Sequence, residues 1–453
     1  MKAKVGFGEI TAADVARAAE GRLVGDSAVI TGICTDSRET EPGSLFAAIR
    51  GEKTDGHEYI EKAFTPGGVT ALCERIPENL DGNFIVVKDT VEALGKIAAY
   101  YRRKNLKVVG VTGSVGKTTT KEFIAAALGN EKVFRTRGNF NSTIGLPLSI
   151  MEIPWDTEMA VLEMGMSARG EIEGMSKAAR PDVAVITNIG SSHLEMLGSR
   201  ENILAAKLEI VSGMRDDGIL LINGDDPMLC SAKVKQRTLK VGFGENCDFR
   251  AEIVSENGGE TEFSVNGVKI KIPTYGKHNV YAAALGFAAA KLLGVDETDA
   301  IRGLSDFEKP KMRQNIYEYG GVTVIEDCYN ASPESMRAAL DVANILAKEK
   351  NARIVALLGD MLELGENTEK LHFEVGEYAR KSGVKKLITL GALAENIADG
   401  AALPDTVRIK DRDHERAADA LVGELKVGDV FLVKASRGVA AEKVLEIYKE
   451  RRK

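Results

Sequence analysis

The sequence predicts an α/β protein of three domains, and three observations support that fold class. The chain has 453 residues, more than one hydrophobic core usually supports. Apolar runs typical of strands buried on both faces alternate with helical stretches. Two changes of pattern divide the chain into a small N-terminal α/β domain over residues 1–88, a central domain over 89–312 and a C-terminal domain over 313–453.

The first domain is predicted from short strand-like runs that are separated by turn clusters. These runs are "AVITGICTD", "GSLFAAIRG", "VTALCE" and "NFIVVKD". An Ala-rich amphipathic helix, "TVEALGKIAAYYRRKN", leads from this domain into the next.

The central domain is predicted to contain a parallel sheet with an antiparallel hairpin added to it. The strand candidates are "LKVVGVTG", "EMAVLEMG", "PDVAVITNIG" and "DGILLING". Between Asp248 and Pro273 the pattern changes to alternation, and "ENGGE" and the Asn266-Gly267 pair are turn signals. Short antiparallel strands are therefore expected there.

The third domain begins after the charged segment "FEKPKMRQ" and again alternates strand with helix. Its runs include "GVTVIEDC", "PESMRAALDVANILAKEK", "ARIVALLGD", "VKKLITLG" and "DVFLVKASRG". This order predicts a Rossmann-like domain. A G-x-G-x-x-G fingerprint is missing from it, so we do not expect a bound dinucleotide.

Composition excludes several classes of protein. Sixty basic and 67 acidic residues give a net charge of −7, and no long basic run indicates a nucleic-acid partner. The start "MKAKVGFGEITAADVARA" lacks an apolar leader, and no apolar run is long enough for a membrane span, so we expect a cytoplasmic protein. Five scattered cysteines indicate buried thiols without a zinc ribbon or disulfide framework. We expect a monomeric enzyme of small molecules.

The stretch "VVGVTGSVGKTTTKEF", from Val108 to Phe123, predicts a phosphate-binding loop between a strand and a helix. Gly113 and Gly116 allow backbone N–H groups to turn toward a phosphate, and the helix N-terminus adds partial positive charge. Lys117 would reach the β and γ oxygens, and Thr118 would bind Mg²⁺. The general pattern asks for glycine at Val111, which we assign to the strand, with the loop beginning at Thr112. The alternative is a Gly-rich turn without a ligand.

Further polar residues follow the next apolar strands. Glu163 ends "AVLEMG" and His193 follows "VITNIGSSH", at the carboxyl edge where open α/β sheets bind ligands. Both are candidates for the metal site; an ordinary loop glutamate and a polar-network histidine are the alternatives. Lys207 lies in an apolar helical stretch, where spacing alone predicts a lysine whose amine reaches solvent.

These motifs together resemble the ATP-dependent Mur ligases of peptidoglycan synthesis over essentially the whole chain. "TGSVGKTT" is similar to the family's phosphate loop, which needs no glycine at Val111. The other matching motifs are "RGNFNSTIGLPLSI", "EMGMSARGEI", "TNIGSSHLEMLGS" with the following Lys207, "NGDDP", "GKHN" and "EDCYNASP".

The resemblance implies roles for individual residues. Lys207 would be carbamylated by CO₂ and would bind Mg²⁺ together with Thr118, Glu163 and His193; Lys117 would act with them in catalysis. Asn279 would bind adenine, although Ala282 stands where the family often has a second asparagine. Arg313 and Asp327 would contact the nucleotide. The implied phosphate-loop contacts to ATP are Thr112, Gly113, Ser114, Val115, Gly116, Lys117, Thr118 and Thr119.

Two segments resemble the family branch that adds D-Ala-D-Ala to UDP-N-acetylmuramoyl-tripeptide. "TDSRETEPGSLFAAIRGEKTDGHEYI" is similar to its uridine-nucleotide module, and "ALLGDMLELGE" and "KASRG" to its third domain. Asp360 and Glu363 lie in "ALLGDMLELGE", and the alternative explanation for them is a loop acid and a helix-cap acid. The implied substrate-binding residues are Asp36, Ser37, Arg38, Asn139, Asn141, Asn330, Ser436 and Arg437.

The resemblance implies an ADP-forming peptide ligase that works through an acyl phosphate. Three alternatives remain open at this stage. They are a sister ligase that adds a diamino acid to the dipeptide precursor, a folate-type polyglutamate ligase and a non-catalytic P-loop switch.

Overall fold

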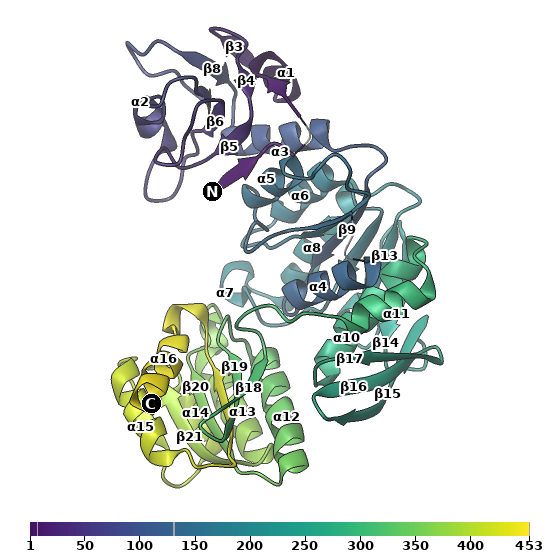
Figure 1. Ribbon diagram of the computed structural model, residues 1–453, viewed down its shortest axis with the longest axis vertical. Coiled ribbons are helices and arrows are strands. Elements are labelled where there is room, and N and C mark those ends of the chain that lie inside the picture. Colours follow the sequence, from purple (N-terminus) through teal and green to yellow (C-terminus); the bar gives the residue numbers. More distant parts are fainter. Residues whose placement is uncertain (7, 130–131, 453) are drawn as a thin grey trace.

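The computed structural model describes residues 1–6, 8–129 and 132–452, and over these residues it confirms the predicted α/β class. Figure 1 shows three sheet-containing parts that follow one another along the longest axis, from the N-terminal part through the central part to the C-terminal part. Each large sheet is built from one continuous part of the chain.

The first sheet contains short strands, of which the inner four run parallel and the edge strands β1 and β3 antiparallel. Its order is β1 (Lys2–Lys4), β5 (Gly32–Cys34), β6 (Ser44–Ala47), β7 (Thr70–Cys73), β8 (Asn83–Val86) and β3 (Arg22–Val24). A smaller pair joins β2 (Ile10–Thr11) to β4 (Val29–Ile30). The helices are α1 (Ala12–Ala18), η1 (Gly56–Tyr59), α2 (Ile60–Ala63) and the connecting α3 (Thr90–Tyr101).

The central sheet is parallel up to β15 and antiparallel beyond it, which confirms the predicted hairpin. Asn266 and Gly267 both have positive φ, +49° and +83°, which a tight two-residue hairpin turn requires. The strand order is β10 (Val133–Arg135), β11 (Met159–Glu163), β9 (Lys107–Thr112), β12 (Val183–Ile186), β13 (Ile219–Asn223), β14 (Arg237–Gly242), β15 (Phe249–Asn257), β16 (Glu260–Val265) and β17 (Val268–Ile272).

Helices cover both faces of this sheet, and apolar side chains fill the space on its two sides. The helix after the phosphate loop packs closely on α10, where a Cβ added to Gly286 would lie 2.9 Å from the carbonyl oxygen of Phe123. The helices are α4 (Lys117–Leu128), α5 (Gly145–Met151), α6 (Glu171–Ala179), α7 (Leu194–Leu197), α8 (Arg200–Leu208), η2 (Glu209–Gly213), α9 (Pro227–Ser231), α10 (Lys277–Leu292) and α11 (Glu297–Ser305).

The third sheet is parallel except for the edge strand β18, which pairs antiparallel with β19. Its order is β18 (Asn315–Tyr319), β19 (Val322–Asp327), β23 (Val430–Lys434), β20 (Ile354–Gly359), β21 (Val384–Leu390) and β22 (Val407–Ile409). The helices are α12 (Pro333–Lys350), η3 (Gly365–Asn367), α13 (Thr368–Lys381), α14 (Glu395–Ala401), α15 (His414–Glu424), η4 (Arg437–Val439) and α16 (Glu442–Arg451). Among the described residues, none of the helices combines the length and apolarity that a membrane crossing needs.

Candidate active site between the central and third domains

The predicted phosphate loop joins β9 to α4 as the sequence indicates. Val111 lies in β9, fully buried, and α4 begins at Lys117. Gly113 has no room for a side chain, because a Cβ there would lie 1.9 Å from the Thr187 hydroxyl oxygen. Gly116 caps the helix with φ +83°, a conformation that favours glycine. Both glycines are therefore required by the turn itself.

Lys117 folds back over this loop. Its amine donates to the carbonyl oxygens of Gly113, at 2.8 Å, and Ser114, at 3.3 Å. Burial lowers the pKa of Lys117, and the nearby Glu163 carboxylate opposes that shift.

Asn188, which was not among the residues expected from the sequence, also contacts the loop: its side-chain oxygen accepts from the Val115 N–H at 3.0 Å. Its position directly after β12 was the signal that could have identified it.

Glu163 and His193 lie on the wall of the same cavity as Lys117 and Thr118. Glu163 ends β11 and is 2% exposed; its Oε1 accepts from the Asn141 amide at 2.9 Å. Its Oε2 is buried and has no hydrogen-bond partner among the described residues. His193 precedes α7 with φ +65°. The predicted convergence of these strand ends is present.

Lys207 is completely buried in α8, which excludes the solvent-reaching lysine that spacing alone predicted. In the described part of the chain its amine has no hydrogen-bond partner. Burial holds the pKa of Lys207 well below its ordinary value, and the charge of Lys117 lowers it further. A buried amine without a partner is costly, so this position needs a reason beyond packing.

A cavity of about 510 Å³ lies between the phosphate loop and the third domain. Arg313 reaches across it, and its guanidinium donates to the Thr118 hydroxyl at 3.1 Å. The same guanidinium lies 4.1 Å from the centre of the Tyr329 ring. Tyr329 was not predicted, although it stands inside the quoted motif "EDCYNASP". The two domains thus form opposite walls of one pocket.

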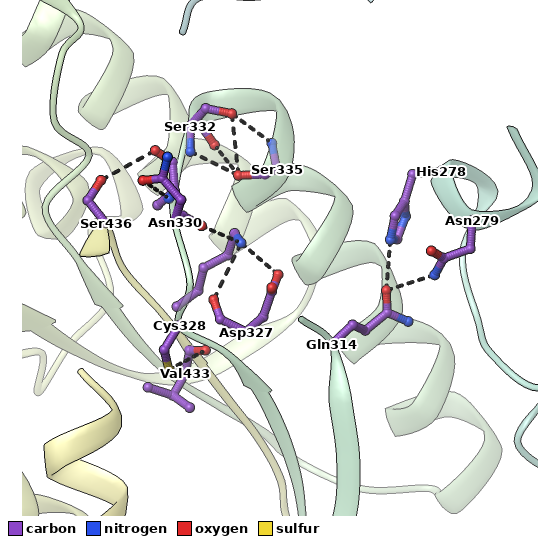
Figure 2. A network of polar contacts seen from close by, with 12 residues as sticks. His278, Asn279, Gln314, Asp327, Cys328, Asn330, Ser332, Ser335, Val433 and Ser436 are labelled. Carbon is purple, nitrogen blue, oxygen red and sulfur yellow. Dashed lines mark hydrogen bonds and ion pairs between the residues drawn. The ribbon is translucent and has the colours of Figure 1, made fainter. Parts of the chain in front are cut away.

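Asn279 lies on the cavity wall, and Figure 2 shows it beside His278 and Gln314. The Asn279 amide nitrogen donates to the Tyr275 carbonyl oxygen at 2.7 Å and to Gln314 Oε1 at 2.9 Å. His278 Nε2 lies 2.7 Å from the same Gln314 oxygen. Gln314 was missed because it lies outside any strand or motif, directly after Arg313.

Figure 2 shows Asp327 and Asn330 near each other on the other side of the view, and both contact Lys434. The Lys434 amine donates to Asp327 Oδ2 at 2.6 Å and to the Asn330 carbonyl oxygen at 3.0 Å. Asp327, Asn330 and Lys434 all line the cavity. Lys434 was not selected from "KASRG", because a buried lysine at the end of a strand has no distinct pattern.

Several predicted residues lie away from this cavity. Thr112 is a buried strand residue that donates to the Met164 carbonyl oxygen at 2.8 Å. The Ser436 hydroxyl is buried and accepts from the Leu362 N–H at 3.0 Å, and exposed Arg437 pairs with Glu442 at 2.8 Å. Asn139 is exposed. Among the described residues, none of these four lines the cavity.

Asp36, Ser37 and Arg38 follow β5 in the first sheet and do not line the cavity either. Asp36 and Arg38 form a two-pronged ion pair, with Nε and Nη2 at 2.9 Å and 2.6 Å from the carboxylate oxygens. This arginine holds the pKa of Asp36 far below its usual value. Asp360 is 1% exposed, pairs with Arg412 at 2.9 Å and accepts from the Ala394 N–H at 2.8 Å, contacts that support the alternative of a loop acid.

The residues around Lys117 fit a divalent cation of the Mg²⁺ type. Among the described residues, no three His, Cys, Asp or Glu side chains lie close enough together to hold a metal ion. A metal site here would therefore need ligands of other kinds as well. Glu163 Oε2 is buried, accepts no hydrogen bond among the described residues and lies 3.9 Å from the Lys121 amine, so it is a suitable hard ligand. The Thr118 hydroxyl and His193 line the same space. The unpartnered amine of Lys207 adds a ligand only if it gains a carboxylate group.

Three family descriptions match successive parts of the chain. Residues 29–109 match "Mur ligase family, catalytic domain", residues 111–290 match "Mur ligase middle domain", and residues 312–437 match "Mur ligase, glutamate ligase domain". Together these matches extend over all three sheets.

Curated relatives and solved structures agree with these matches over nearly the whole length. The UDP-N-acetylmuramoyl-tripeptide–D-alanyl-D-alanine ligase of Bacillus subtilis is 41% identical over 96% of this chain and 97% of its own. The enzyme of that name from Escherichia coli is 32% identical over 95% and 96%. A crystal structure of MurF from Acinetobacter baumannii has TM-score 0.90 at 31% identity, covering 98% and 100%. MurF from Thermotoga maritima in complex with ADP has TM-score 0.82 at 33% identity, covering 93% and 98%.

Proposed function

The chain belongs to the Mur ligase family, and from this premise we infer that it adds D-Ala-D-Ala to UDP-N-acetylmuramoyl-tripeptide while ATP is converted to ADP and phosphate. The product is the UDP-N-acetylmuramoyl-pentapeptide of peptidoglycan synthesis. Relatives that bear this activity in their names match 95% or more of the chain, including the first and third domains that distinguish the family's branches.

One structural observation supports ligase chemistry above the alternatives. The cavity joins a phosphate loop and Glu163 on the central side to Arg313, Asp327 and Lys434 on the third-domain side. A nucleotide switch needs only the phosphate loop and a metal ligand. A ligase must bring two further substrates to the γ-phosphate, and a pocket walled by two domains provides that space.

The chemistry follows from the poor leaving group of a carboxylate. The terminal carboxylate of the tripeptide attacks the γ-phosphorus of ATP, and ADP leaves with its bonding electrons. The amine of D-Ala-D-Ala, after loss of a proton, attacks the resulting acyl phosphate, and phosphate leaves from the tetrahedral intermediate. Lys117 would stabilise charge on the moving phosphoryl group, and Arg313 would do so from the opposite wall.

Mg²⁺, when bound, neutralises charge on the phosphate oxygens. We propose that Thr118, Glu163, His193 and a carbamylated Lys207 hold it. The neutral amine of Lys207 adds to CO₂ and releases one proton, which gives a carbamate. Complete burial and the missing hydrogen-bond partner support this proposal. A ¹³C NMR carbamate signal in wild type incubated with ¹³C-bicarbonate, missing from Lys207→Ala, would support it; no signal in wild type would refute it.

We also propose that residues 1–88, 89–312 and 313–453 each bind a different substrate. The first would bind the UDP-muramoyl peptide near Asp36, Ser37 and Arg38, together with Asn139 and Asn141 of the second. The second would bind ATP. The third would bind the dipeptide through Asn330, which lies on the cavity wall, and through Ser436 and Arg437, which do not line the cavity.

A substrate-pair assay tests the function directly. Phosphate release with ATP and UDP-N-acetylmuramoyl-tripeptide is measured with D-Ala-D-Ala, and in parallel with the dipeptide precursor plus lysine or diaminopimelate. Release with the first pair only is expected. Release with the second pair only would establish the sister ligase. Polyglutamylation of a folate would favour the folate-type enzyme, and ATP turnover with neither pair would favour the switch.

A further inference from the structure

The third domain contacts the loop that contains His193 at two points. Glu334, at the start of α12, accepts from both the N–H and the hydroxyl of Ser191 at 3.0 Å. Two residues beyond His193, the Glu195 N–H donates to the carbonyl oxygen of Glu363 at 3.5 Å. A Cβ added to Gly365 would lie only 3.1 Å from Glu195 Cα, so the two backbones are in close contact.

Between these points, the side chains of His193 and Glu363 face each other. His193 Nδ1 lies 3.2 Å from Glu363 Oε2, and the two side chains are 23% and 58% exposed. Both residues have φ +65°, a left-handed conformation that costs on the order of 1 kcal/mol for a side chain other than glycine. A simple surface turn would use glycine at these positions.

The segment that contains Glu363 is held firmly from behind. The buried ring of His372 accepts from the Met361 N–H at 2.9 Å, and its other nitrogen lies 2.7 Å from the Thr368 carbonyl oxygen. The Leu362 N–H donates to the Ser436 hydroxyl at 3.0 Å. Glu363 is therefore presented by a fixed support that also contacts the proposed dipeptide-binding residue Ser436.

A histidine that binds a metal through one ring nitrogen commonly donates its other N–H to a carboxylate, which fixes the ring orientation. We propose that Glu363 is the positioning residue of His193, and that it acts from the third domain on the Mg²⁺ site of the central domain. Contact at Nδ1 leaves Nε2 as the nitrogen available to the metal. The proposal rests on the proposed function. It implies that the metal site is complete only when the third domain packs against the central domain, so that Glu363 contacts His193.

Three variants test this role. Glu363→Ala removes the carboxylate, Glu363→Gln keeps an oxygen that accepts from Nδ1, and Glu366→Gln removes a charge from an exposed neighbour as the matched control. Mn²⁺ serves as the probe, and its binding to each full-length protein with saturating ADP is followed by electron paramagnetic resonance. We expect Glu363→Ala to raise the Mn²⁺ dissociation constant about tenfold or more. Glu363→Gln should give a smaller rise, and Glu366→Gln none.

A second measurement separates positioning from stability. Because Glu363 is more than half exposed, the thermal midpoint of each variant should stay near that of wild type. In the ligation assay, Glu363→Ala should need about tenfold more Mg²⁺ for half-maximal rate, with the KM for D-Ala-D-Ala unchanged. Wild-type affinity for Mn²⁺ in Glu363→Ala, or equal loss in Glu366→Gln, would overturn the proposal, as would wild type that binds no Mn²⁺.

The Mn²⁺ experiment uses neither the muramoyl peptide nor the dipeptide. If wild type fails to join D-Ala-D-Ala to the tripeptide, the proposed function fails, while the comparison of Mn²⁺ affinities still decides the role of Glu363. Conversely, wild-type ligation with unchanged Mn²⁺ affinity in Glu363→Ala would reject the positioning role alone.

Discussion

The central and third domains each contain a buried lysine near the cavity, and the two lysines are compensated in opposite ways. Lys434 is 2% exposed, and its amine pairs with Asp327 at 2.6 Å and with the Asn330 carbonyl oxygen. Lys207 is completely buried, and among the described residues its amine has no hydrogen-bond partner. The same residue type is thus a satisfied structural cation at position 434 and an unsatisfied group at position 207.

The difference between the two lysines indicates that Lys207, unlike Lys434, lowers the stability of the fold and is kept for a functional reason. Satisfied pairs such as Lys434 with Asp327 fix the wall of the cavity. An unpartnered buried amine destabilises the fold, and its pKa is held low by burial and by Lys117. Such a cost is typical of groups that react or bind a ligand.

The largest expected effect concerns Lys117, the neighbour of Lys207. Lys117→Ala should reduce ligation by at least about a thousandfold, because the phosphoryl group loses its main cation. Far-UV circular dichroism should match wild type, since the amine contacts only carbonyl oxygens of its own loop. Lys177→Ala, at an exposed position of the same domain, is the control and should retain activity. Substantial ligation by Lys117→Ala would refute the role assigned to the phosphate loop.

Replacing Lys434, whose amine is paired with Asp327, should mainly affect stability. Lys434→Met should lower the free energy of unfolding by about 3 kcal/mol, because it leaves the Asp327 carboxylate without its partner. Urea unfolding measures this loss, and adding Asp327→Asn should recover part of it. Unchanged stability in Lys434→Met would show that the pair is not what fixes this wall.

Replacing Lys207, whose amine has no hydrogen-bond partner among the described residues, should change the free energy of unfolding in the opposite direction. Lys207→Met should abolish ligation yet raise the free energy of unfolding by about 1 kcal/mol, because a flexible apolar side chain replaces a buried amine. The same urea experiment compares it with Lys434→Met. Equal destabilisation by both substitutions would remove the distinction between the two lysines.

A partly exposed charge in the first domain should give the smallest effect. The Asp55 carboxylate accepts from the His57 N–H and pairs with Arg75, and these contacts hold its pKa far below the usual value. Asp55→Asn should cost about 1 kcal/mol at pH 7. Because the folded-state pKa is depressed, the difference should begin to shrink as the pH falls below about 3.9 and should disappear only below the depressed folded-state pKa. A difference between the two proteins that does not shrink as the pH falls through this range would contradict the assignment.

Much of the central domain could be predicted because parallel strands align their carboxyl ends. Val111, Gly113, Gly116 and Lys117 lie as the loop pattern indicates, and Glu163 and His193 line the same cavity. The boundary at Thr112 was one residue early, since its backbone still pairs with Ile186 in the sheet. Local pattern therefore sufficed wherever a strand end defined the position.

Contacts between domains could not be predicted, because they depend on how separately folded parts pack. Gln314 reaches the cavity from the third domain without a motif of its own, and Tyr329 does so from within "EDCYNASP", where no role was assigned to it. Ser436 was expected to face the site, yet its hydroxyl accepts from the Leu362 N–H. The contact of His193 with Glu363 joins two loops that no sequence spacing connects.

The central claim is that the γ-phosphate of ATP makes the tripeptide carboxylate reactive. UDP-N-acetylmuramoyl-tripeptide labelled with ¹⁸O in both oxygens of that carboxylate tests it directly, with mass spectrometry of the released phosphate. If the acyl phosphate forms and the amine displaces phosphate, each phosphate molecule should contain one ¹⁸O. Unlabelled phosphate released together with the pentapeptide product would contradict the account.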